Sequence, residues 1–176
     1  IPRYFTLFPY KEYEAWGRGY RDLVKKLVLW KDNYADVIVA RPDYSPYIYY
    51  LFYASADPQK AQKDLIYYSA TSEGFQHVRS FDGITYQKID WAEELLVPDR
   101  LYIDWVESIP TGATNSAIII TQDELLRLQS KGYTTEKVKL GDWVTSQIID
   151  EIKIPNGNPY IYFIATQVGT HSATLR

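Results

Sequence analysis

The chain has 176 residues, of which 46% are hydrophobic and 23% are charged, a composition typical of one globular domain with a full core. Its 19 basic and 22 acidic side chains give a net charge of −3 without a basic cluster, which argues against a general nucleic-acid binder. There is no cysteine, so disulfides and thiol catalysis are excluded. There is no methionine either, so we expect a processed product or a fragment of a longer protein.

The chain is rich in tyrosine and tryptophan, with 17 and 5 residues respectively. These side chains combine a large apolar body with a polar tip, so they suit core positions, interfaces and sugar-binding surfaces alike. No apolar run approaches the roughly 20 residues that span a bilayer. If the chain belongs to a membrane protein, we expect the spans to precede Ile1.

The first elements are an extended lead-in and an amphipathic helix. Residues 1–11 are aromatic and contain two prolines, which indicates extended chain. From Glu12 onward the apolar residues recur with helical spacing, and Gly17 and Gly19 weaken the first turns. The predicted apolar stripe consists of Trp16, Tyr20, Leu23, Val24, Leu27 and Val28.

The chain is organised around residues 35–65, which predict a strand, a loop and two helices. Residues 36–40 are an apolar, β-branched run of the kind that is buried on both faces of a sheet. Pro42 ends this strand, and Ser45 followed by Pro46 is a helix start signal. We expect residues 47–53 (YIYYLFY) to form a mostly buried helix, and Asp57-Pro58 to begin a more polar one.

The later sequence predicts two hairpins, another strand and a strand followed by a helix. The hairpins turn at Asp82-Gly83 and at residues 155–158, and residues 101–106 read as a strand. Residues 117–120 predict a buried strand, followed by a helix with a Thr121/Glu124 capping box that stops at Gly132. The polar tail, residues 169–176, is expected to be loose.

These elements predict a single soluble α/β domain over residues 1–176. The expected architecture is a three-layer sandwich with a mixed, mostly parallel central sheet and hairpin edges, and the alternative is an α+β arrangement. Parallel pairing is expected between residues 37–39 and 117–120, because each strand leads into a helix.

No catalytic, cofactor or metal motif is found in the sequence. There is no nucleophile elbow, P-loop or zinc signature, and His77 and His171 are not spaced as metal ligands. Among the acidic residues near strand ends, Asp57 and Asp90 suit a helix cap and a turn, and Asp104 suits a solvated strand face. Asp43 is the least explained of these acids, and two roles stay open for it: ligand binding at the loop, or a structural role in which it pairs with Arg41 to hold the loop.

The central stretch and several flanking motifs carry a resemblance to a known family. These motifs are PYIYYLFY followed by DP, the early FPY and WGRGY, then FDGITY with IDW, and the closing PNG. In this order they resemble the C-terminal soluble domain of membrane glycosyltransferases of the dolichyl- or polyprenyl-phosphate-mannose–protein mannosyltransferase family. In that family the loop often carries glycine before the proline, where this chain has Ser45.

The resemblance implies a non-catalytic, extracytoplasmic domain attached to the transmembrane portion of the same polypeptide. Such enzymes transfer a sugar from a polyprenyl-phosphate carrier, and their catalytic carboxylate lies in the membrane part. This domain would then support engagement of a glycan, an acceptor protein or the polyprenyl-phosphate head group. Two alternatives stay open: a free carbohydrate- or protein-binding module, and a glycoside hydrolase with a carboxylate pair.

The candidate ligand-binding residues are Arg41, Asp43, Tyr44 and Tyr47. They follow the predicted central strand, and ligands of open α/β sheets bind outside the carboxyl ends of strands. We expect Thr121 and its helix to meet the same edge. No catalytic residue, metal or cofactor is assigned.

Overall fold

The computed structural model describes residues 17–95, 97–133 and 138–169, and the chain forms an α/β fold. The expected lead-in and the expected tail beyond Gly169 lie outside the described residues. The helices are α2 (Arg18–Trp30), α3 (Pro46–Tyr53), α4 (Pro58–Asp64), α5 (Trp91–Glu94) and α6 (Gln122–Ser130), with 3-10 turns η1 (Lys31–Asn33), η2 (Pro42–Tyr44) and η3 (Val106–Ser108). The strands are β1 (Asp36–Val39), β2 (Ile66–Tyr67), β3 (Val78–Phe81), β4 (Ile84–Tyr86), β5 (Arg100–Trp105), β6 (Ser116–Ile119), β7 (Trp143–Lys153) and β8 (Pro159–Gly169).

All eight strands belong to one mixed, open sheet in the order β2-β3-β4-β1-β5-β8-β7-β6. Strand β1 is interior, as predicted, and pairs in parallel with β4 and β5. The other five pairings are antiparallel, so the expectation of a mostly parallel sheet is wrong. The expected pairing of β1 with residues 117–120 is also wrong, because β6 lies at the far edge and pairs with β7.

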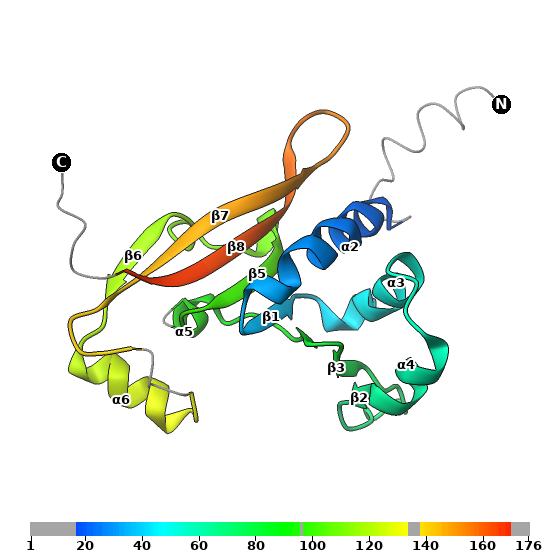
Figure 1. Cartoon of the computed structure of the whole chain (residues 1–176), viewed down its shortest axis with the longest axis horizontal. Helices are drawn as coiled ribbons and strands as arrows, with labels where there is room; N and C mark the ends of the chain where they lie inside the picture. The colour runs from blue at the N-terminus through cyan, green and yellow to red at the C-terminus, as the bar shows by residue number, and fades with distance from the viewer. Residues whose placement is uncertain (1–16, 96, 134–137, 170–176) are drawn as a thin grey trace.

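Both predicted hairpins are present. Strands β3 and β4 are joined at Asp82 and Gly83, whose positive φ angles of 53° and 79° fit a tight hairpin turn. The long hairpin of β7 and β8 projects beyond the rest of the sheet in Figure 1. The chain that follows β4 crosses β1 and returns as β5, which places β1 between the two.

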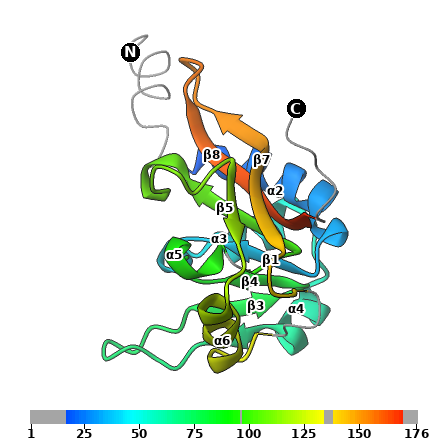
Figure 2. The same cartoon turned by 90° about the vertical axis from the view of Figure 1, so that its left-hand side faces the viewer.

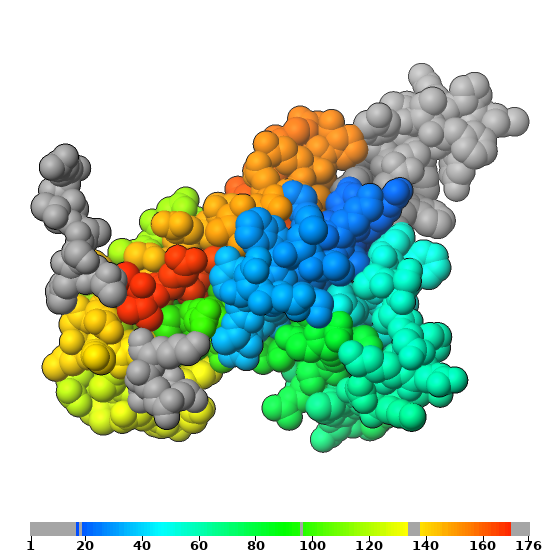
Figure 3. All heavy atoms as spheres, viewed as in Figure 1, coloured from blue at the N-terminus to red at the C-terminus, as the bar shows by residue number. Residues whose placement is uncertain are grey.

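The two faces of the sheet are covered by different helices. Side chains of α2, α3 and α4 pack on one face with Val37, Val39 and Ile103. Ile38 and Tyr102 point to the opposite face, where they meet Trp91 of α5. Figure 2 shows α2 and α5 on opposite sides of the sheet, and Figure 3 shows how α2 fills the surface between the β7–β8 hairpin and the α3–α4 region.

Helix α2 carries the predicted apolar stripe from Tyr20 onward, while Trp16 lies outside the described residues, and Gly17 allows the helix to approach α3. Four stripe residues are buried, namely Tyr20, Leu23, Val24 and Leu27, whereas Val28 is partly exposed. Tyr20 stacks on Tyr49 of α3 with ring centroids 4.0 Å apart. Gly17 has a φ of 58°, and a Cβ there would lie 2.7 Å from the Tyr49 hydroxyl. Glycine at this position therefore serves packing and backbone conformation.

The prediction that residues 47–53 form a mostly buried helix is right in type and wrong in burial. Within α3 only Pro46 and Tyr50 are buried, while Ile48 is 52% and Phe52 is 74% exposed. The helix lies at the margin of the α2 layer, so one side of it faces solvent. Strand β6 shows the same kind of error, since its residues alternate between exposed and half-buried positions.

The helix caps follow the sequence signals more closely. Asp57 and Asp90 cap α4 and α5 by accepting hydrogen bonds from the backbone N–H of Gln59 and Ala92. The Thr121/Glu124 capping box is formed at the start of α6. Ser45 is the exception, because its backbone is left-handed and its side chain makes no capping hydrogen bond.

Candidate binding crevice

The carboxyl ends of β4, β1 and β5 lie side by side in the middle of the sheet. Val39 is in register with Tyr86 of β4 and Ile103 of β5. Two further backbone hydrogen bonds extend the ladders, from Ala40 N–H to the Ile103 carbonyl (2.9 Å) and from Gln87 N–H to the Val39 carbonyl (3.2 Å). The three segments that follow these strands therefore leave the sheet at one edge, where open α/β sheets bind ligands.

A cavity of about 380 Å³ lies at this edge, and we call it the crevice. It is lined by residues from all three segments: Ala40, Arg41, Asp43 and Tyr44 after β1, Lys88 and Ile89 after β4, and Asp104, Glu107 and Ser108 at the end of β5 and in η3. Three of the four predicted binding residues, Arg41, Asp43 and Tyr44, therefore come together in the crevice.

Two predicted members of the site lie elsewhere. Tyr47 is not part of the lining and packs edge-on against Tyr86, with ring centroids 6.4 Å apart. Thr121 begins α6 after the edge strand β6, which is separated from β5 by β8 and β7. The expectation that Thr121 meets the crevice is thus wrong, because it depended on a parallel pairing of β6 with β1.

Arg41 connects two of the segments that line the crevice. Its guanidinium pairs with the Glu107 carboxylate and donates a 3.3 Å hydrogen bond to Ser108 Oγ. It also lies over the rings of Trp105 and Tyr44, at 4.5 and 5.8 Å from their centroids. These contacts fix the guanidinium at the junction between the β1 and β5 segments.

The loop after β1 is held in an uncommon backbone conformation. Arg41 and Ser45 flank η2 and both are left-handed, with φ angles of 57° and 51°. Each such non-glycine residue costs on the order of 1–3 kcal/mol, and residues of this kind cluster at ligand-binding sites. The left-handed residues on either side of η2 make the loop turn tightly, so that Asp43 and Tyr44 line the crevice before α3 begins.

Asp104 is buried at the crevice, which corrects the expectation of a solvated strand face. Only 3% of the residue is exposed. Its carboxylate accepts hydrogen bonds from Trp91 Nε1 (3.0 Å) and from the backbone N–H of Trp105 (2.7 Å). Burial raises the pKa of Asp104 above its ordinary value, although both hydrogen bonds act in the opposite direction.

Asp43 lies at the more exposed rim of the crevice. Its carboxylate is 3.6 Å from Lys88 Nζ and 3.9 Å from His77 Nε2. Asp43 thus joins the β1 segment to the β4 segment, as Arg41 joins it to the β5 segment. Exposed pairs of this kind contribute little to stability, about 0–1 kcal/mol each.

The part of the crevice that comes from the segments after β4 and β5 was not predicted from the sequence. Lys88 and Ile89 come two and three residues after the end of β4, and Glu107 and Ser108 come two and three residues after the end of β5. A usable signal was present, because residues 101–105 are apolar on both faces except for Asp104. A lone acid in such a run indicates a buried carboxyl group at the end of an interior strand.

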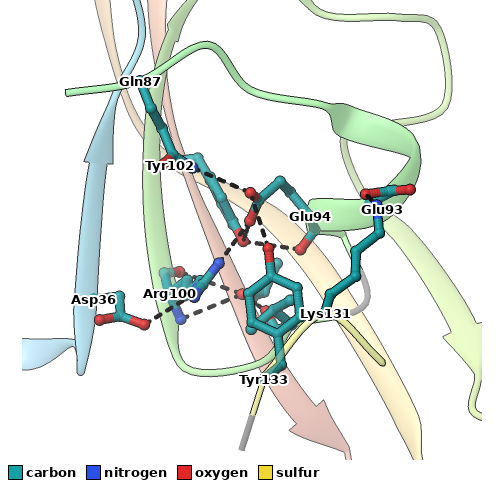
Figure 4. Close-up of polar contacts among 10 residues, drawn as sticks. Asp36, Gln87, Glu93, Glu94, Arg100, Tyr102, Lys131 and Tyr133 are labelled. Carbon is teal, nitrogen blue, oxygen red and sulfur yellow. Dashed lines mark hydrogen bonds and ion pairs between the residues drawn. The ribbon is translucent and has the colours of Figure 1, made fainter. Parts of the chain in front are cut away.

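A second polar cluster lies near the amino ends of β1 and β5 and is shown in Figure 4. Glu94 accepts hydrogen bonds from Arg100 Nη1 (2.6 Å), Gln87 Nε2 (3.2 Å) and the hydroxyls of Tyr102 (3.1 Å) and Tyr133 (3.3 Å). Burial and the nearby Glu94 carboxylate raise the pKa of Tyr102. The carboxylate is satisfied from four sides, so this cluster ties α5 to the sheet rather than forming a ligand site.

Within residues 17–95, 97–133 and 138–169, no group of three or more histidine, cysteine, aspartate or glutamate side chains is arranged to hold a metal ion. No helix in the same ranges has the length and apolar character needed to cross a bilayer.

Comparison with protein-family models, with curated proteins and with solved structures found no match to this chain.

Proposed function

We propose that this chain is a non-catalytic, extracytoplasmic domain of a membrane glycosyltransferase that uses a polyprenyl-phosphate sugar. Its own role is to engage a glycan or a glycan acceptor in the crevice. One observation carries this proposal: Arg41, Asp43 and Tyr44, chosen from the sequence as binding residues, line a cavity at the carboxyl ends of three parallel strands.

The chemistry of the crevice supports a ligand with many hydroxyl groups. Asp43 and Glu107 supply hydrogen-bond acceptors, and Arg41 supplies donors. Tyr44 is 67% exposed, and its ring offers a flat apolar surface beside these groups. A sugar ring presents hydroxyls at its edge and C–H groups on its faces, so it complements both.

The departure from the mannosyltransferase family pattern at position 45 is compatible with the backbone there. Ser45 is left-handed, with a φ of 51°, a conformation that glycine adopts without strain. The family often has glycine at this place, so the loop conformation suits both residues. Attachment to transmembrane helices and a place on the extracytoplasmic face follow from the resemblance alone. The alternative of a free carbohydrate-binding module would be favoured by a parent gene that encodes a signal peptide without membrane spans.

Glycoside hydrolysis is a second candidate function, which Asp104 favours. A buried carboxyl group with a raised pKa beside other carboxylates is the arrangement used by a general acid. We place it second because both Asp104 oxygens already accept hydrogen bonds from Trp91 and Trp105.

The binding role is tested with a matched pair of exposed aromatic residues. Tyr44 and Phe52 are both largely exposed, but only Tyr44 lines the crevice. We expect Tyr44→Ala to weaken the binding of uncharged oligosaccharides, measured by calorimetry, by about tenfold. Phe52→Ala should leave the affinity unchanged. Equal effects of the two substitutions, or no binding by the unmodified domain, would contradict the proposal.

The non-catalytic role is tested by assaying the purified domain with glycosides and with a polyprenyl-phosphate sugar. We expect neither hydrolysis nor transfer. Turnover that is abolished by Asp43→Asn or Asp104→Asn would instead establish the hydrolase alternative.

A further inference from the structure

The charges around the crevice are unusual for a site that would bind phosphate. Its lining contains two cationic side chains, Arg41 and Lys88, and three carboxyl groups, those of Asp43, Asp104 and Glu107. With Asp104 protonated the charges balance, and with Asp104 ionised the negative charges are in excess. The crevice therefore carries no net positive charge in either state.

Both cations are already paired with carboxylates of the same lining. Arg41 pairs with Glu107, and Lys88 Nζ lies 3.6 Å from Asp43. The Arg41 guanidinium is further held over the Trp105 ring. A phosphate group could reach either cation only by displacing its carboxylate, and it would then lie close to that carboxylate's negative charge. Phosphate sites in proteins instead gather cations and backbone N–H groups.

The same groups suit an uncharged polyhydroxylated ligand. Each carboxylate can accept several hydrogen bonds from hydroxyl groups, and a neutral ligand does not disturb the two ion pairs. The acceptors of Asp43 and Glu107 lie on adjacent segments of the lining, after β1 and in η3, and Arg41 joins these segments. A ligand in the crevice thus meets hydrogen-bond acceptors from both segments.

We propose that the crevice selects an uncharged saccharide and excludes the phosphate head group of a lipid carrier. This inference rests on the proposed function and names the ligand class of the same site. The crevice would then bind the glycan, and another part of the parent protein would bind the carrier phosphate.

Calorimetry with two kinds of probe tests the selection. The uncharged probes are mannobiose and cellobiose, and the anionic probes are farnesyl phosphate and inorganic phosphate. We expect at least one disaccharide to bind with an affinity that changes less than about twofold between about 50 mM and about 500 mM NaCl, because no charge is exchanged. Neither phosphate should bind or compete with the disaccharide.

One variant makes the charge argument itself testable. Glu107 is largely exposed, so Glu107→Gln should fold, and it leaves the Arg41 charge without its partner. We expect this variant to acquire salt-sensitive affinity for farnesyl phosphate, whereas Glu73→Gln, at an exposed residue outside the crevice, should not.

The possible outcomes separate the two proposals. Binding of farnesyl phosphate at the crevice of the unmodified domain, or no gain of phosphate affinity in Glu107→Gln, would overturn the selectivity and leave the proposed function standing. Failure of both disaccharides and both phosphates to bind would overturn the inference and the proposed function together.

Discussion

At the scale of single residues, Asp82 shows how one carboxylate can join three elements. It lies in the β3–β4 turn and accepts hydrogen bonds from Tyr50 of α3 (2.6 Å), Lys60 of α4 (2.9 Å) and Lys31 of η1 (3.2 Å). Burial alone would raise its pKa, but these three donors outweigh burial and hold the pKa at about 2. The ionised form of Asp82 is thereby stabilised in the folded state.

We expect Asp82→Asn to lower the free energy of unfolding at pH 7 by roughly 2 kcal/mol, the equivalent of the pKa shift. Asparagine is well suited to the left-handed turn position, so the turn itself should be retained. The folded pKa lies below the unfolded pKa of about 3.9, so this stabilisation is present above about pH 4 and is lost as the pH falls toward about 2.

Urea denaturation of both proteins at several pH values measures this effect. The difference between Asp82→Asn and the unmodified domain should disappear near pH 2. Asp22→Asn is the control, because the pair of Asp22 with Lys25 is exposed and its loss should change stability little. A difference that is the same at pH 7 and pH 2 would show that the three hydrogen bonds do not depend on the charge.

At the scale of elements, β1 is an interior strand whose side chains pack against the helices on both faces of the sheet. Strands β4 and β5 pair with it in parallel, one on each side. Ile38 of β1 is buried on the face of the sheet that α5 covers. A side chain in such a place cannot be removed without leaving a cavity.

We expect Ile38→Ala to lower the free energy of unfolding by about 2–5 kcal/mol. Ile119→Ala on the edge strand β6 is the matched control, because Ile119 is 44% exposed and should cost far less. Both values come from chemical denaturation. A similar loss in the two variants would argue against β1 as an interior strand.

The loop between β1 and α3 is expected to carry strain that a substitution can release. Ser45→Gly should raise the free energy of unfolding by up to about 1 kcal/mol, because relief of the left-handed strain exceeds the entropy cost of glycine. Ser45→Val should lower the free energy of unfolding, since a β-branched residue is poorly accommodated at positive φ. Thermal unfolding measures both, and equal melting temperatures would contradict a left-handed residue 45.

The positions of the helices and strands were more predictable from the sequence than the burial of their side chains or the pairing of the strands. Helix α6 was found from its capping box, and the β3–β4 hairpin from Asp82-Gly83, because these signals depend on neighbouring residues alone. The exposure of α3 and the edge position of β6 depend on contacts between distant residues. The sequence of an aromatic helix such as α3 therefore predicts burial, although three of its eight residues are exposed.

At the scale of the whole molecule, the crevice forms because β4 and β5 are the parallel neighbours of β1 in the sheet. Arg41, Asp43 and Tyr44 were predictable because they follow a recognisable interior strand. Glu107 and Lys88 were not, because the sequence alone does not show that β4 and β5 are the parallel neighbours of β1. Our central proposal is that the domain binds its ligand in the crevice.

The most direct test is a map of amide chemical shifts in the domain as an uncharged oligosaccharide such as mannobiose is added. Our account predicts shifts that cluster at residues 41–45, 88–89 and 107–108, which surround the crevice. Shifts confined to the β7–β8 turn at Asn156 and Gly157, or to the exposed side of α3, would contradict it.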